Sequence, residues 1–280
     1  MSKRYNAQQV AFLTQHGKEK LIAPLLEPFL DCSVVHVTGY DTDQLGTFSG
    51  EVKRLDTQIE TARKKARIGM DLAKLPFGLA SEGAFVADPF GGLMPWNIEV
   101  VVWLDDEDQF EVIGIAQGPA LSLHRALRKV ADLEHFALEA GFPEHHLVVR
   151  PQSDKDPRMV KGLANWDDLR KAFIDCHGLA ENGLVYAEND HRAFCSPTRQ
   201  AMIVQATRDL MKKFESTCPA CTLPGFSVTG QKSGLVCRSC GNTTKAPMSY
   251  IMTCNACQHS EEKRASQQWA EPSQCDVCNP

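Results

Sequence analysis

The sequence predicts an α/β protein, with a mixed sheet covered by helices and a small zinc-ribbon domain after it. Over residues 1–215, short apolar runs rich in β-branched residues alternate with segments of helical periodicity. Strands separated by helices form sheets whose faces the helices cover. From residue 216 onward eight of the eleven cysteines come as four CxxC pairs. We therefore expect an α/β domain at 1–215 and a zinc-ribbon domain at 216–280.

The first half of the α/β domain reads as an alternation of strands and helices. The expected elements are a strand at 10–14, a helix at 18–29, a strand at 32–37, a helix at 51–73, and strands at 77–80, 98–104 and 110–116. An acidic turn, Asp105 to Asp108, separates the last two strands and predicts a hairpin. Since a hairpin is antiparallel, the sheet should be mixed.

The second half begins with a helix that Ser122 is expected to cap, with an apolar face running from Leu123 to Leu138. The elements expected after it are strands at 146–150, near 160 and at 183–187, and helices at 166–176 and 197–214. The last helix has a clear start, because Ser196 suits the N-cap and Pro197 the first helical position.

Composition limits the class of protein. The chain has 280 residues, is 43% apolar and carries a formal charge of −5. It has no apolar run of the roughly 18 residues that cross a bilayer, and its first residues lack the apolar stretch of a secretory signal. We expect a cytoplasmic protein without membrane contact, in which any nucleic-acid binding needs a local basic patch.

The four CxxC pairs predict two structural zinc sites. The eight cysteines are Cys218, Cys221, Cys237, Cys240, Cys254, Cys257, Cys275 and Cys278. A sequential assignment, the first two pairs to one ion and the last two to another, is simplest, and an interleaved one stays open. Disulfides are disfavoured because no export signal is seen. Four thiolates leave no position for water, so neither zinc is expected to be catalytic.

The charge of the tail bears on its partner. Residues 216–280 contain five Lys and Arg against four Asp and Glu, which is near neutral. Binding to a phosphate backbone needs clustered cations. Packing on the main domain or on a protein partner is therefore at least as consistent with the tail as a nucleic-acid role.

Two basic segments are candidate phosphate binders. Gly17 stands before an expected helix start, where free amides and the side chains of Lys18 and Lys20 would favour an anion. Lys65 lies in the basic stretch of the helix expected at 51–73 and is a candidate to point inward toward a phosphate. An ordinary turn and a solvated basic face are the competing interpretations.

Carboxylates supply a candidate magnesium site. Glu82 follows a strand and is flanked by the small residues Ser81 and Gly83, and Asp88 and Glu99 are close in sequence, so two or three carboxylates could come together. Glu82 with Asp88 would hold Mg²⁺ through oxygen ligands and water, as phosphoryl chemistry requires. The alternative is an exposed acidic loop.

A dense polar cluster precedes the last expected helix. Asp190, His191, Arg192 and Arg199 surround its positively polarised start, and His191 is a candidate general acid or base. Arg192 and Arg199 are candidates to contact the rest of a substrate, while a structural role for His191 is equally consistent. Cys195 also lies at this helix start, but its distance from Arg199 is not the phosphatase spacing of cysteine, five residues and arginine.

Two resemblances extend this reading. The ordered segments HGKEKLIAPLLEP, DTDQLGTFSGEV, ASEGAF, GFPEHHLVVRP and the CPAC to CNP tail are similar to a bacterial family that carries a domain of unknown function. More distantly, the turn at 14–18, the helix segment at 61–66 and the acidic segment at 81–83 resemble three motifs of the inosine triphosphate pyrophosphatase superfamily. That resemblance implies a shared fold and a site that binds nucleotide phosphates.

Together these features predict a metal-assisted hydrolase of a nucleotide or another phosphate ester, with structural zinc ribbons. In this interpretation the lysines hold phosphates, Glu82 and Asp88 bind Mg²⁺, and His191 takes part in catalysis. The rival interpretation is a non-catalytic binding protein whose ribbons engage a protein or nucleic acid.

Overall fold

A computed structural model describes residues 4–46 and 56–280. Its central part is a five-stranded mixed sheet with the order β2-β1-β3-β4-β5. The strands are β1 (Gln9–Leu13), β2 (Ser33–Val37), β3 (Phe77–Ala87), β4 (Pro95–Asp105) and β5 (Phe110–Pro119). β1 is parallel to both β2 and β3, whereas β3, β4 and β5 form an antiparallel meander. The mixed sheet and the hairpin at Asp105 are thus confirmed.

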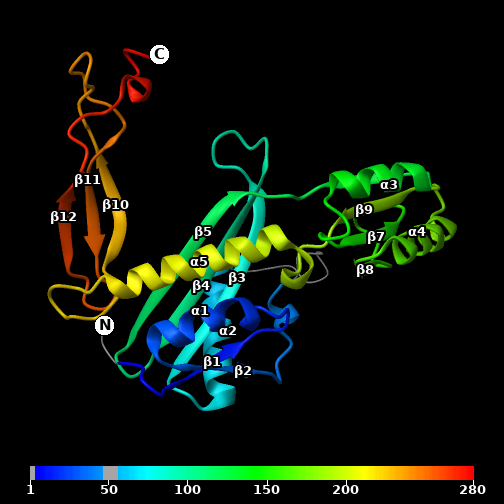
Figure 1. Cartoon of the computed structure of the whole chain (residues 1–280), viewed down its shortest axis with the longest axis horizontal. Helices are drawn as coiled ribbons and strands as arrows, with labels where there is room; N and C mark the ends of the chain where they lie inside the picture. The colour runs from blue at the N-terminus through cyan, green and yellow to red at the C-terminus, as the bar shows by residue number, and fades with distance from the viewer. Residues whose placement is uncertain (1–3, 47–55) are drawn as a thin grey trace.

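Helices cover both faces of this sheet (Figure 1). They are α1 (Glu19–Leu30), α2 (Gln58–Ala73) and α5 (Pro197–Glu215). α1 and α5 pack on the face that carries Phe12, and α2 packs on the face that carries Leu13. Successive side chains of a strand point to opposite faces, so the apolar strands supply two cores at once.

A second, smaller sheet is inserted between β5 and α5. Its strands are β6 (His124–Leu127), β7 (Leu147–Pro151), β8 (Val160–Leu163) and β9 (Val185–Asn189), in the order β6-β9-β7-β8, all antiparallel. α3 (Val130–Glu139) and α4 (Trp166–Leu179) complete it. It has its own apolar core, around Phe136 and Phe173. We call this unit the inserted lobe; in Figure 1 it stands apart from the long strands.

Three expected elements need correction. Residues 124–127 are not helical but form β6 on β9, and α3 begins only at Val130 with Lys129 as its N-cap, because strand pairing outweighs the local helical period. β3 does not end at residue 80 but runs to Ala87, since it pairs with β4 along its whole length. α2 begins at Gln58, where Thr57 Oγ1 accepts the Glu60 N–H, and residues 51–55 of the expected helix lie outside the described residues.

The cysteine-rich tail is a three-stranded antiparallel ribbon. Its strands are β10 (Ser227–Ser233), β11 (Pro247–Thr253) and β12 (Ser260–Arg264). Leu223 and Ala256, at one end of the ribbon, pack against the core beneath α1 and α5, and the other end projects away (Figure 1). In the described part of the chain, no helix has the length and apolarity to cross a membrane.

Candidate functional site

One cleft lies between the five-stranded sheet and the inserted lobe. It forms at the carboxyl end of β1, beside β3. The next strand in the sequence, β2, lies on one side of β1, and the strand after that, β3, lies on the other side. Open α/β sheets bind ligands at such a switch point, outside the carboxyl ends of the strands. The cleft is lined by six of the residues predicted from the sequence, namely Lys18, Lys65, Glu82, His191, Arg192 and Arg199.

Lys18 reaches the cleft from the turn between β1 and α1. Gly17 adopts φ +71°, a left-handed conformation that favours glycine, and α1 starts two residues later. The Lys18 side chain is buried, and its Nζ donates to the backbone oxygen of Ser81 at 2.9 Å and lies 3.4 Å from Ser81 Oγ. Burial, and next the charge of Arg199, lower the pKa of Lys18 to about 7.

Lys65 and Glu82 form the second part of the site. Lys65 projects from α2 and its Nζ lies 2.5 Å from Glu82 Oε2 on β3. Both side chains are largely buried, with 12% and 3% of their surface exposed. Lys65 therefore points inward, as expected, and a carboxylate of the chain neutralises it.

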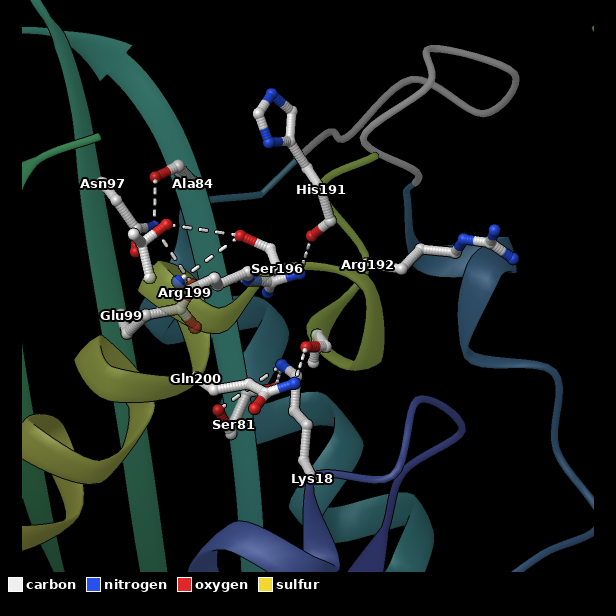
Figure 2. A network of polar contacts seen from close by, with 12 residues as sticks. Lys18, Ser81, Ala84, Asn97, Glu99, His191, Arg192, Ser196, Arg199 and Gln200 are labelled. Carbon is white, nitrogen blue, oxygen red and sulfur yellow. Dashed lines mark hydrogen bonds and ion pairs between the residues drawn. The ribbon is translucent and has the colours of Figure 1, made fainter. Parts of the chain in front are cut away.

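The start of α5 supplies Arg199. Ser196 Oγ accepts the Arg199 N–H at 3.4 Å and Pro197 occupies the first turn, so the predicted cap and helix start are confirmed. Arg199 Nε donates to Glu99 Oε1 on β4 at 2.7 Å, and one guanidinium nitrogen donates to the His191 backbone oxygen at 2.5 Å. Figure 2 shows this buried network between the helix start and the long strands.

The segment that leads from β9 back to α5 contributes Asp190 and Arg192. The Asp190 carboxylate accepts from the Arg192 guanidinium at 2.5 Å and from the Gly162 N–H at 3.0 Å. Although burial opposes ionisation, the bonds from Arg192 hold the pKa of Asp190 below its usual value. The Arg192 guanidinium also lies 4.8 Å from the ring centroid of Phe194. Its orientation is thus fixed from two sides.

The His191 side chain is held by a hydroxyl group and an aromatic ring. Its Nε2 lies 2.9 Å from Ser122 Oγ, and its ring stacks on Phe85 with centroids 3.8 Å apart. Figure 2 shows the imidazole directed away from Lys18 and Ser81. Burial, and next the charge of Arg199, lower the pKa of His191 to about 4, so the ring is neutral near pH 7.

Two predicted residues do not join the cleft. Lys20 is exposed and is not among the cleft residues. Asp88 lies in the β3–β4 loop, where its carboxylate accepts the N–H groups of Phe90, Gly91 and Met94 at 2.7 to 2.9 Å. These backbone bonds, with the Met94 N–H first, lower the pKa of Asp88 to about 2. Asp88 therefore stabilises its own loop.

The donor set does not fit the expected magnesium site. Glu82 and Asp88 are not brought together, because β3 continues as a strand between them. Each carboxylate that lines the cleft already contacts a basic side chain, in the pairs Asp43–His16, Glu82–Lys65, Glu188–Arg150 and Asp190–Arg192. Across residues 4–46 and 56–280, groups of three or more metal-binding side chains occur only among the cysteines.

Sequence reasoning gave Ser81 and Lys161 no role of their own, and it considered Glu99 only as a further magnesium ligand. Ser81 and Lys161 line the cleft, and Glu99 is the partner of Arg199. Glu99 had a readable signal, since it is a single acid within the apolar run of β4. Cys195, by contrast, is buried, which raises the pKa of its thiol to about 12 and excludes an activated thiolate.

The eight tail cysteines form two tetrads. One contains Cys218, Cys221, Cys254 and Cys257, and the other Cys237, Cys240, Cys275 and Cys278. Sulfur–sulfur distances across the tetrads are 3.6 to 3.8 Å. Four thiolates at about 2.3 Å from a tetrahedral zinc ion are about 3.8 Å apart, so each tetrad can hold a metal ion and zinc fits its donors.

The interleaved pairing corrects the sequential assignment. The first CxxC turn precedes β10 and the second follows it, and a seven-residue strand separates its ends by about 23 Å. β11 runs antiparallel to β10, so the third turn returns to the first and the second is left for the fourth. Strand pairing, which the spacing of the cysteines does not reveal, decides the ligand sets.

Comparison with known proteins gives a family but no activity. No curated protein matches the chain. A family model described as a domain of unknown function, DUF6671, matches residues 65–280, which include the cysteine tail and every described cleft residue from Lys65 onward. Because this match covers well over half of the chain, the protein belongs to the DUF6671 family.

Proposed function

We propose that the cleft binds a phosphorylated small molecule and that the protein hydrolyses a nucleotide or another phosphate ester there. One observation carries the proposal: four basic side chains from separate parts of the chain meet at the switch point of the sheet. They are Lys18 at the start of α1, Lys65 on α2, Arg192 beside the inserted lobe and Arg199 on α5. A cleft at this position with converging charge is the usual place of an anionic ligand.

The local backbone favours a phosphate in particular. The first amides of α1 and the positive end of its dipole lie beside Lys18, and Gly17 leaves its side of the turn open. Positive charge preorganised in a water-poor cleft stabilises the charge that develops during phosphoryl transfer.

The proposal assigns no magnesium ion to the cleft, because Glu82, Glu188 and Asp190 are paired with cations of the chain and Asp43 contacts His16. The acids also lower the net charge of the cleft, which favours a substrate of modest charge. The zinc tetrads belong to the ribbon and have a structural role in this proposal, since four thiolates close the coordination shell.

The test compares Lys65, which lines the cleft, with Lys20, which is exposed on a helix of the same five-stranded sheet. Wild type, Lys65→Met and Lys20→Met are offered nucleoside triphosphates, nucleoside monophosphates and p-nitrophenyl phosphate, with and without Mg²⁺, and released phosphate and pyrophosphate are measured. Wild type and Lys20→Met should turn over the same substrate, and Lys65→Met should lose most of that activity. Absence of turnover by wild type across the panel would refute hydrolysis. If wild type then still binds sulfate, the protein is a non-catalytic ligand-binding protein.

A further inference from the structure

Lys18 differs in its partners from Lys65, Arg192 and Arg199. Lys65, Arg192 and Arg199 each form an ion pair with a carboxylate. In the described residues Lys18 has no carboxylate within ion-pair distance, and its amine contacts only the backbone oxygen and the hydroxyl of Ser81. An amine that is buried without a counter-ion is most stable in its neutral form.

The charged side chains that act on Lys18 come from α5, α2, β4 and β3, and the titratable His16 lies in the same turn as Lys18 and senses its charge. Arg199 of α5 and Lys65 of α2 disfavour its protonation, while Glu99 of β4 and Glu82 of β3 favour it. The two acids are already neutralised by the two cations, in the pairs Glu99–Arg199 and Glu82–Lys65. Desolvation is therefore the dominant effect, and it brings the pKa of Lys18 to about 7, near the pH of the cell interior.

We propose that Lys18, oriented by Ser81, is the general base of the cleft. This inference rests on the hydrolytic function proposed above. As the oxygen of the attacking water forms its bond to phosphorus, a water proton passes to Lys18 Nζ. The bond from phosphorus to the leaving oxygen breaks, and the leaving group departs with that electron pair. The Lys18 ammonium then returns its proton to solvent.

The geometry favours Lys18 over the residues first expected to carry the chemistry. Glu82 is engaged by Lys65 at 2.5 Å, and His191 is stacked on Phe85 and bonded to Ser122 at the far side of the network (Figure 2). Lys18 lies at the carboxyl end of β1, where the amides of α1 would hold the phosphate. Proton uptake there also creates a cation beside an anionic transition state, so one residue supplies both base and charge.

Two variants of Lys18 distinguish the effect of its positive charge from its ability to accept and release a proton. Lys18→Arg keeps a cation but does not deprotonate near neutral pH, whereas Lys18→Met removes the charge and keeps much of the length. With the substrate found above, Lys18→Arg should retain substrate binding and lose turnover by about 10²- to 10⁴-fold. Wild-type kcat/KM, which reports the free enzyme, should rise with pH around 7, and Ser81→Ala should shift that midpoint. A Lys18→Arg variant that keeps wild-type turnover and its pH profile would overturn the proposal.

A second measurement decides the inference even if hydrolysis fails. Lysines labelled with ¹³C at Cε are titrated by NMR, and the Lys18 signal is assigned by its loss in Lys18→Arg. A midpoint near 7 in the free protein, moving upward when sulfate is added, supports the proposal. Sulfate does not titrate in this range, so the shift reports the amine alone. A midpoint above about 9, close to that of an ordinary lysine, overturns it whether or not any substrate is turned over.

Discussion

Removing one partner of the Glu99–Arg199 pair should destabilise the fold severely. The two side chains are 0% and 1% exposed, and their charged atoms lie 2.7 Å apart. Arg199→Met leaves the Glu99 carboxylate buried without its counter-charge, and a change of this kind costs about 3–5 kcal/mol. Since whole domains are stable by only about 5–15 kcal/mol, this is a large share of the total.

The pair itself contributes much less than that cost suggests. Two charges removed from water lose their hydration, and a buried pair replaced by apolar residues of similar volume is often neutral or even stabilising. The double variant Glu99→Met/Arg199→Met should therefore recover most of the stability that Arg199→Met loses. Arg125→Met is the matched control, because its partner Glu139 is exposed and such a pair contributes under about 1 kcal/mol.

Urea unfolding measures the free energy of unfolding of each variant, provided that the signal reports on the core under α5. Trp103 is fully buried in the core under α5, so a background with Phe at Trp96, Trp166 and Trp269 isolates its fluorescence. All samples contain the same zinc concentration, since metal binding shifts the equilibrium. The electrostatic argument would be refuted if Arg199→Met lowered the free energy of unfolding by less than about 1 kcal/mol. It would also be refuted if the double variant were no more stable than Arg199→Met.

Three further predictions follow from the same contacts. Gly114→Ala should cost about 3 kcal/mol in urea unfolding, because a Cβ there would lie 2.1 Å from the Ala206 backbone oxygen of α5; Gly118→Ala should cost much less, because a Cβ there would meet only the Met202 side chain, at 3.6 Å. Cys254→Ser should raise the rate of amide hydrogen exchange at the end of α5, whereas Cys240→Ser, in the other tetrad, should leave it unchanged. The reason is that the ribbon end next to Cys254 packs on the core under α5 through Leu223 and Ala256. Between pH 7 and 10 the unfolded chain binds a proton at Lys18 that the folded chain lacks, so wild-type stability should rise relative to Lys18→Met by about 1.4 kcal/mol per pH unit; a flat difference would contradict the lowered pKa.

The elements that sequence predicted well are those whose local signals agree with their tertiary role. α5 begins at Ser196 and Pro197 as expected because the cap and the first turn are properties of adjacent residues. The helix predicted over 124–127 was wrong, because these side chains suit a helix and only pairing with β9, about sixty residues later, makes the segment a strand. Whether the chain divides at residue 215 stays a prediction, although α5 ends there.

In the site, too, local sequence patterns indicated the residues, but their partners are distant in sequence. Lys18, Lys65 and Arg199 each had a local reason to be considered, and the topology of the sheet brings them to one cleft. The partners that set their chemistry are not local: Lys18 contacts Ser81 and Arg199 contacts Glu99, across 63 and 100 residues of sequence. Sequence patterns therefore identified cations but not their protonation or pairing.

The position of the inserted lobe explains why the cleft mixes both signs of charge. The lobe leaves the sheet after β5 and returns at the start of α5, so the returning segment passes along the open end of β1 and β3. That segment must cap α5, anchor the lobe and complete the cleft at once, which is why Asp190, Arg192 and Ser196 are all engaged by neighbours. Lys18 stands outside this arrangement of paired charges, and a ligand that supplies the missing anion would complete it.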